Sequence, residues 1–247
     1  MTSLNQLGFF ITPEHDCSYL QGYKAQTLFT DPASTVDTPT YTELTQLGFR
    51  RSGKHIYRPH CKNCKACIST RILVKDFSPS RNQKRLLNKN SDIDWKSWPP
   101  SLREDYFRLY CLYINARHVD GDMHPPSLDQ FESFLVEGRS EARFYEMRLN
   151  SRLVGVSVVD WINDGVSAIY TFFDPAEGKR SLGSFAILKL IEECRQKGLE
   201  HVYLGYWIRN SEKMNYKIRF IPLQLFIEGN WYTVTKDMRQ SLPIKLI

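Results

Sequence analysis

The 247-residue chain has no long hydrophobic run: no 18 consecutive apolar residues occur, so no membrane-spanning helix is predicted. Residues 1–16 contain no basic segment followed by an apolar block, which predicts the absence of a secretory signal. Internal repeats and low-complexity tracts are also missing, which argues against a repeat architecture. We therefore expect a cytosolic protein that has no membrane partner.

Cysteines are few: the chain has six. Without an export signal, six cysteines favour free thiols or metal ligands over a disulfide framework. Hydrophobic residues make up 42% of the chain, which is enough for a substantial core. The length suits one large domain or two of about 120 residues.

Acidic residues are scarce in one region. Residues 50–89 hold 12 lysines and arginines but a single acid, Asp76, which gives this segment a charge of +11. The whole chain carries only +6, so the remainder is acidic, at −5. An ordinary solvated face is one interpretation of such a run. The one-sidedness of the segment favours a polyanionic partner instead.

The most regular pattern lies in the C-terminal half. Residues 142–149, 153–161 and 166–173 predict three strands joined by short hairpin turns. Apolar residues at helical period predict a helix over residues 182–197. Residues 202–206 predict a buried strand that pairs beside the third one. The expected unit is therefore a β-meander, a crossover helix and one more strand.

The junction before this helix reads Arg180-Ser181-Leu182-Gly183, and free N–H groups in a first helical turn favour anions. The order of elements resembles the GNAT acyltransferase superfamily, whose loop at this place holds the pyrophosphate of acetyl-CoA. A CoA-dependent N-acetyltransferase is therefore an alternative function. The superfamily has a second Gly or Ala where this chain has Phe185, whose ring we expect to crowd a diphosphate.

Three cysteines, Cys61, Cys64 and Cys67, form two overlapping C-x-x-C pairs, a spacing typical of zinc and iron–sulfur sites. A fourth ligand would come from Cys17, since Cys111 and Cys194 fall in helical patterns. Reduced thiols with a structural or redox-sensitive role remain the other interpretation. A metal-stabilised regulator that binds nucleic acid is a second alternative function.

A basic helix is predicted over residues 81–89, and the tryptophans and prolines of residues 94–100 indicate a linker. Capping boxes starting at Ser101 and Ser127 predict two further helices. We therefore expect an N-terminal domain over residues 1–98 and a C-terminal domain over residues 99–247.

Taken together, several motifs resemble the arginyl-tRNA–protein transferase family of the N-degron pathway, most closely its bacterial, leucine-transferring branch. They cover about residues 9–231 in the family's order. The matching segments are residues 17–20, 25–29 and 57–59 with the three cysteines that follow, Tyr113 with Arg117 and His118, and residues 173–175, 181–183, 202–208 and 213–217.

The resemblance implies transfer of leucine from leucyl-tRNA to the α-amine of proteins that begin with Asp or Glu, which marks those proteins for degradation. It implies an α+β architecture in which a cysteine-containing N-terminal half packs on a C-terminal GNAT-like domain. The arginyl branch has a second cysteine where this chain has Leu20. That departure argues against arginine as the transferred residue. DNA is not an expected partner.

An aminoacyl ester on tRNA is already activated, so this chemistry requires no cofactor besides leucyl-tRNA as co-substrate. Orientation of amine and ester supplies about 7–11 kcal/mol. The acceptor amine has an ordinary pKa of about 7.7–8.0, so part of it is neutral. We predict that Asp174 receives or orients the ammonium proton and that Tyr206 bonds the ester or the amine.

The acceptor's carboxylate needs a cation. The predicted acceptor-binding residues are Arg117, His118, Lys213 and Lys217. The tRNA acceptor stem needs phosphate contacts that position it without reading its sequence. The predicted tRNA-binding residues are Arg81, Lys84, Arg85, Lys89 and Arg180.

Overall fold

The computed structural model describes residues 4–209 and 211–235. The strands of its first half are β1 (Phe9–Ile11), β2 (His15–Asp16), β3 (Lys24–Ala25), β4 (Thr27–Thr30), β5 (Arg50–Ser52), β6 (His55–Pro59) and β7 (Ile68–Leu73). Those that follow are β8 (Ile93–Trp98), β9 (Ala142–Leu149), β10 (Arg152–Ile162), β11 (Gly165–Phe173), β12 (His201–Trp207), β13 (Leu223–Ile227) and β14 (Asn230–Val234). The α-helices are α1 (Thr38–Gln46), α2 (Arg81–Lys89), α3 (Glu104–Arg117), α4 (Leu128–Phe131) and α5 (Leu182–Gln196).

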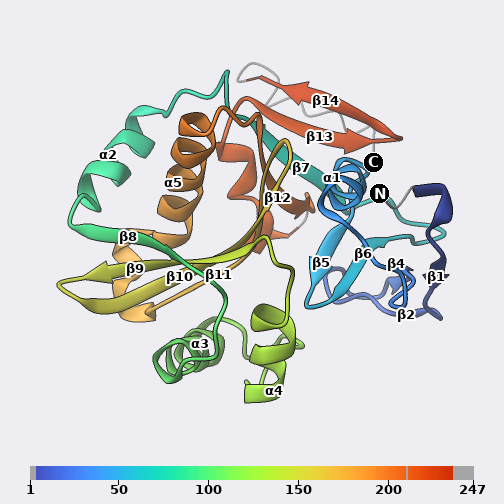
Figure 1. Ribbon diagram of the computed structural model, residues 1–247, viewed down its shortest axis with the longest axis horizontal. Coiled ribbons are helices and arrows are strands. Elements are labelled where there is room, and N and C mark those ends of the chain that lie inside the picture. Colours follow the sequence, from blue (N-terminus) through green and yellow to red (C-terminus); the bar gives the residue numbers. More distant parts are fainter. Residues whose placement is uncertain (1–3, 210, 236–247) are drawn as a thin grey trace.

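Eight of these strands form one large mixed sheet, in the order β14-β13-β7-β12-β11-β10-β9-β8 (Figure 1). A four-stranded sheet, β1-β4-β6-β5, lies at one end of it, next to α1, and β2 pairs only with β3 (Figure 1). Of the helices formed by residues 4–209 and 211–235, none is long and apolar enough to cross a bilayer.

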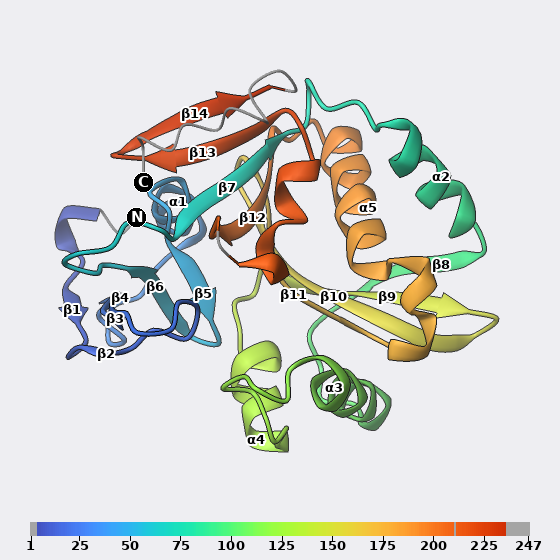
Figure 2. The same ribbon diagram turned by 180° about the vertical axis from the view of Figure 1, so that it is seen from behind.

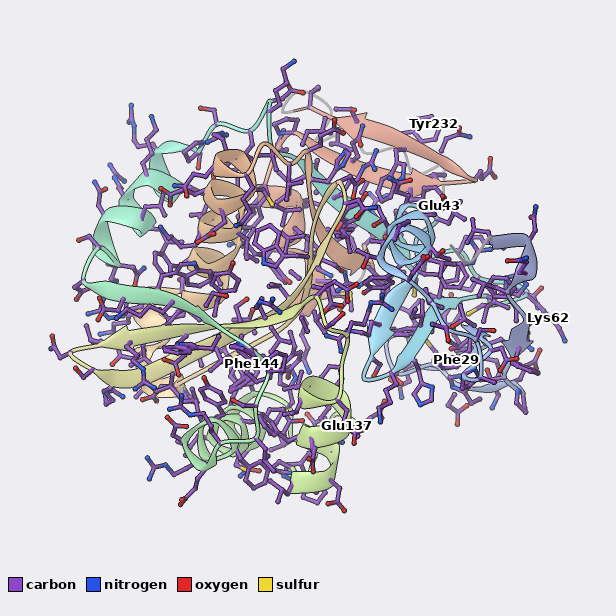
Figure 3. The ribbon with its side chains drawn as sticks, viewed as in Figure 1. Phe29, Glu43, Lys62, Glu137, Phe144 and Tyr232 are labelled. Atoms are coloured by element: carbon purple, nitrogen blue, oxygen red, sulfur yellow. The ribbon has the colours of Figure 1, made fainter. Side chains whose placement is uncertain are left out.

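Helices cover both faces of the large sheet, as the two opposite views show (Figures 1 and 2). One face packs against α2 and α5 through Leu86, Leu188 and Val159. The other face packs against α3 and α4 through Tyr110, Phe131 and Phe144, the last of which is labelled in Figure 3. Val158 and Val159 face opposite sides, as consecutive strand residues do.

The predicted C-terminal unit is confirmed. β9, β10 and β11 form antiparallel hairpins, and β12 pairs with β11 in parallel after the crossover by α5. Asn150 and Ser151 connect β9 to β10 with φ values of 49° and 68°, as a two-residue hairpin turn requires. The mixed α and β architecture is confirmed in this coarse form.

Two local predictions were wrong. Residues 94–100 are not a linker, because Ile93–Trp98 forms β8, the edge strand that pairs with β9. The Trp95 ring stacks on the Tyr145 ring, with their centres 4.7 Å apart, so this tryptophan packs within the sheet and does not lie in an exposed connection. The capping box at Ser101 does not start a helix either, since α3 begins at Glu104 after Arg103. The domain division at residue 98 stays a prediction, although strands from both sides of it share the large sheet.

A buried ion pair joins the small sheet to the large one. Arg51 of β5 and Asp160 of β10 are fully buried, and Arg51 Nε and Nη2 donate to the carboxylate at 2.6 and 2.7 Å. The hydroxyl of Tyr41, on α1, donates to the same carboxylate at 2.9 Å. Three elements therefore meet at one carboxylate.

We predict that Asp160→Asn lowers the free energy of unfolding by about 3–5 kcal/mol, because it leaves the Arg51 charge buried and uncompensated. Urea denaturation measures this. As a control, Lys54→Met removes an exposed pair with Glu137 at 3.0 Å and should cost less than about 1 kcal/mol. Equal small losses in both variants would contradict the proposed importance of the buried pair.

Candidate active site

The site begins where two parallel strands separate. β11 and β12 pair only at Gly165–His201, Val166–Val202 and Ser167–Tyr203. Beyond these pairs β11 continues to Phe173 and β12 to Trp207 without pairing to each other. We call residues 168–173 and 204–207 the strand fork. Main-chain groups that face the fork need partners other than the neighbouring strand.

Arg50, from β5, occupies the start of the fork. Its Nη1 donates to the hydroxyl of Ser167 at 2.9 Å, and its Nη2 donates to the main-chain oxygen of Ala168. The guanidinium lies against Gly205, where an added Cβ would be 2.9 Å from Arg50 Nε. Gly205 also has a φ of +74° at a register shift in β12. Both the close approach of Arg50 and this left-handed backbone conformation therefore favour glycine at position 205.

Lys217 occupies the next position along the fork. It is 6% exposed, and its Nζ donates to the main-chain oxygen of Tyr206. Burial, and next the charge of Arg50, lower its pKa to about 7. Tyr206 is buried as well, and its hydroxyl donates to the main-chain oxygen of Gly48 at 2.9 Å. Its hydroxyl proton is therefore committed to the small-sheet side, and its predicted catalytic role stays a prediction.

Tyrosines surround the two basic side chains. The rings of Tyr57 and Tyr206 lie 6.3 Å apart. Burial raises the pKa of Tyr19, Tyr57, Tyr206 and Tyr216, and in each case the positive charge of Arg50 partly offsets that effect. Arg50 is thus the common neighbour of four phenolic groups from different parts of the chain.

The four cysteines singled out in the sequence gather beside this cluster. Burial and then the proximity of Cys17, Cys61 and Cys64 raise the pKa of Cys67 to about 12. All six cysteines of the chain are free. Over residues 4–209 and 211–235, no three His, Cys, Asp or Glu side chains are arranged to hold a metal ion. The proximity of the four cysteines supports the prediction that they lie together, whereas the prediction of a zinc or iron–sulfur site gains no support.

Three of the predicted acceptor-binding residues form a rim near the fork, in which Arg117 and Lys213 are exposed and His118 is half-buried. Burial, and then the charges of Lys213 and Arg117, lower the pKa of His118. The ring of Tyr113 lies 5.3 Å from that of His118, and the Arg117 guanidinium lies 5.7 Å from the centre of the Phe173 ring. Lys217 is the fourth predicted residue, and it is the buried one.

Asp174 lies in a different environment. It accepts from Arg152 Nη1 at 2.6 Å and from the main-chain N–H of Ala176 at 2.9 Å. Arg152 also pairs with Glu177, which pairs in turn with Arg180 at 3.2 Å. Asp174 and Arg180 thus belong to one ion-pair network at the β11–α5 junction. The predicted catalytic role of Asp174 stays a prediction.

The same junction bears on the CoA alternative. Phe185 does not crowd the loop, because its ring is buried and meets Trp95 edge-on at 6.2 Å. The charge of Arg180 is instead balanced by Asp92 at 2.8 Å and by Glu177. A diphosphate would therefore meet two carboxylates here. The expected steric obstacle at Phe185 was therefore wrong, and the two carboxylates disfavour a diphosphate electrostatically.

The predicted basic helix is α2, with the bounds expected from the sequence. Ser80 and Gln83 form its capping box, which fixes its start. Arg81, Lys84 and Arg85 are exposed, and within the described part of the chain none of them forms an ion pair. Lys89 donates to the main-chain oxygen of Lys179 at 2.8 Å. These exposed charges are available to a polyanion.

Arg50, Tyr57 and Gly205 are site residues that sequence reasoning missed. Arg50 lies in the basic run, and Tyr57 and Gly205 lie in segments that resemble the family, but no local signal distinguishes them there. The position of Arg50 depends on contacts with residues more than 100 positions away. No local pattern reports such contacts.

Comparisons with known proteins identify the chain as an aminoacyltransferase. Residues 15–85 match the N-terminal part, and residues 105–227 the C-terminal part, of the family described as arginine-tRNA-protein transferase. The chain belongs to this family.

Two relatives are each named aspartate/glutamate leucyltransferase. The relative from Marinobacter nauticus is 52% identical over 237 residues, covering 96% of this chain and 100% of the relative. That from Pseudomonas aeruginosa strain LESB58 is 50% identical over 235 residues, covering 95% and 100%. Among solved structures, FemX superposes with a TM-score of 0.49 and 8% identity over 98% of this chain and 91% of that one.

Lys217 gives a pH-dependent stability. Its pKa is about 7 in the folded protein against an ordinary 10.5, so the unfolded chain binds more protons between these values. The free energy of unfolding should therefore gain a positive slope between about pH 7 and 10.5 from this residue. Lys217→Met should remove that contribution, whereas the exposed-lysine control Lys96→Met should keep it. Parallel pH profiles for wild type and Lys217→Met would contradict the assignment.

Proposed function

We propose that the protein transfers leucine from leucyl-tRNA to the N-terminal α-amine of proteins that begin with Asp or Glu. The observation that carries this proposal is the identity of 50–52% to leucyltransferases along the full length of those relatives. The product would be a protein with an added N-terminal leucine. Its proposed role is the labelling of proteins for degradation.

The reaction forms one amide bond and breaks one ester bond. The neutral amine attacks the ester carbonyl, and the proton that the nitrogen loses ends on the ribose oxygen that leaves. Since the ester is already activated, the protein's contribution is mainly to orient the two substrates. No cofactor other than the aminoacyl-tRNA is required by this balance.

The proposed arrangement assigns the two substrates to separate surfaces. α2 presents exposed charges, which have no acidic partner among residues 4–209 and 211–235, to the phosphates of the tRNA acceptor stem. The rim and the strand fork present basic and tyrosine side chains to the acceptor. We further propose the GNAT-like description of the C-terminal half, supported by its meander, crossover helix and following parallel strand.

The activity is tested by offering labelled leucyl-, arginyl- and phenylalanyl-tRNA to peptides that differ only in a first residue of Asp, Glu, Arg or Ala. We expect label transfer from leucyl-tRNA to the Asp and Glu peptides. Transfer from arginyl-tRNA alone would overturn the donor assignment. Acetylation of the same peptides from acetyl-CoA, without any transfer from tRNA, would favour the alternative function.

We predict that replacing Arg81 and Arg85 by Gln raises KM for leucyl-tRNA and leaves kcat nearly unchanged. The slope of log KM against log salt concentration should fall by about 2, since two phosphate contacts are lost. A matched variant replaces Lys24 and Lys54, whose charges are balanced by Asp16 and Glu137. A fall in kcat with an unchanged salt slope would argue against contact between α2 and RNA.

A further inference from the structure

Two basic side chains are buried at adjacent main-chain positions of the strand fork. Arg50 is 7% exposed and Lys217 is 6% exposed. The guanidinium of Arg50 lies on Gly205, and the Nζ of Lys217 bonds the oxygen of Tyr206, the next residue. They come from segments far apart in the sequence, so the fold itself brings a guanidinium and an amine of lowered pKa together.

Neither charge has an acidic partner within residues 4–209 and 211–235. Their hydrogen bonds go to the uncharged oxygens of Ser167, Ala168 and Tyr206. By contrast, the neighbouring Arg51 is matched by Asp160. A buried charge without a counter-charge is costly, and two of equal sign are costlier still. The site is therefore electrostatically incomplete and favours a negative ligand.

The two side chains also retain unused hydrogen-bond donors. A guanidinium has five N–H groups and an ammonium has three. The recorded bonds use two donors of Arg50 and one of Lys217. The remaining donors are enough to satisfy both oxygens of a carboxylate.

We propose that Arg50 and Lys217 together receive the side-chain carboxylate of the acceptor's N-terminal Asp or Glu. The inference rests on the proposed function and adds the residues that set its specificity. The carboxylate supplies the missing negative charge at the fork. The acceptor's α-amine then lies outside the fork, toward the rim of Arg117, His118 and Lys213.

Burial is what allows such a site to discriminate between acceptors. An exposed cation and a carboxylate attract each other weakly because water and salt screen them. A buried cation loses much more when a neutral carboxamide replaces the carboxylate, since its charge is left unpaired. Arg117 and Lys213 are exposed, so they are poorly suited to distinguish Glu from Gln.

A phosphate of the tRNA is the competing anion. Two observations favour the carboxylate: the basic groups are almost enclosed, and α2 already provides exposed, unpaired charges for phosphates. Tyr19 and Tyr216, which are 46% and 36% exposed, lie close enough to Arg50 to feel its charge. Arg50 therefore has two partly exposed neighbours, which places the proposed site close to the surface.

The test compares kcat/KM for peptides that differ only in Glu or Gln at the first position, with leucyl-tRNA as donor. In Lys217→Met we expect kcat/KM for the Glu peptide to fall at least about tenfold, with little change for the Gln peptide. The Glu-to-Gln ratio should therefore collapse, and KM for leucyl-tRNA should not change. Lys96→Met is the matched control and should keep the wild-type ratio.

Arg50→Lys and Arg50→Gln form a second pair: the first keeps the charge and should retain more of the Glu preference than the second. Thermal melting verifies that the variants compared are folded. An unchanged Glu-to-Gln ratio in Lys217→Met would overturn the inference, as would a rise in KM for leucyl-tRNA alone, which indicates a phosphate site. Wild-type protein that transfers no leucine to the Glu peptide would instead refute the proposed function.

Discussion

The pairing of Arg51 with Asp160 is the constraint on which the rest of the structure depends. It is fully buried and bidentate, and Tyr41 satisfies a further acceptor position of the carboxylate. Such a pair adds little net stability compared with apolar residues, but it tolerates only one relative placement of its partners. It therefore fixes the position of β5, in the small sheet, relative to β10 in the large one. Consecutive strand residues point in opposite directions, so fixing Arg51 also directs Arg50 toward the strand fork.

The fork explains why basic residues are buried there at all. Where β11 and β12 part, the main-chain oxygens of Ala168 and Tyr206 accept hydrogen bonds from side chains. Arg50 and Lys217 bond these oxygens. These hydrogen bonds satisfy the backbone oxygens, but within the described part of the chain neither side chain has an acidic partner. The sheet thus holds two basic groups in place through neutral contacts, which is the condition for a preorganised anion site.

The sequence predicted the C-terminal half well because its signals are local. Turn residues at Asn150 and Ser151 and the helical period of α5 act within a few positions, and both features appear as expected. The prediction of a linker at residues 94–100 was wrong, because an edge strand with tryptophans followed by prolines has the same composition as an exposed connection. The role of Arg50 was out of reach, since it requires a positive φ at Gly205 and contacts across the whole chain.

The basic run of residues 50–89 predicts a polyanionic partner, yet the fold divides the run by burial. Arg50 and Arg51 are enclosed, and Arg71 lies 4.2 Å over the Trp231 ring while donating to Gln224 at 2.7 Å. The charges of α2 stay in water. Screening by salt acts strongly on exposed charges and weakly on enclosed ones. Because α2 is exposed and the proposed acceptor site at Arg50 and Lys217 is enclosed, rising ionic strength should weaken the hold on RNA before it weakens the choice of acceptor.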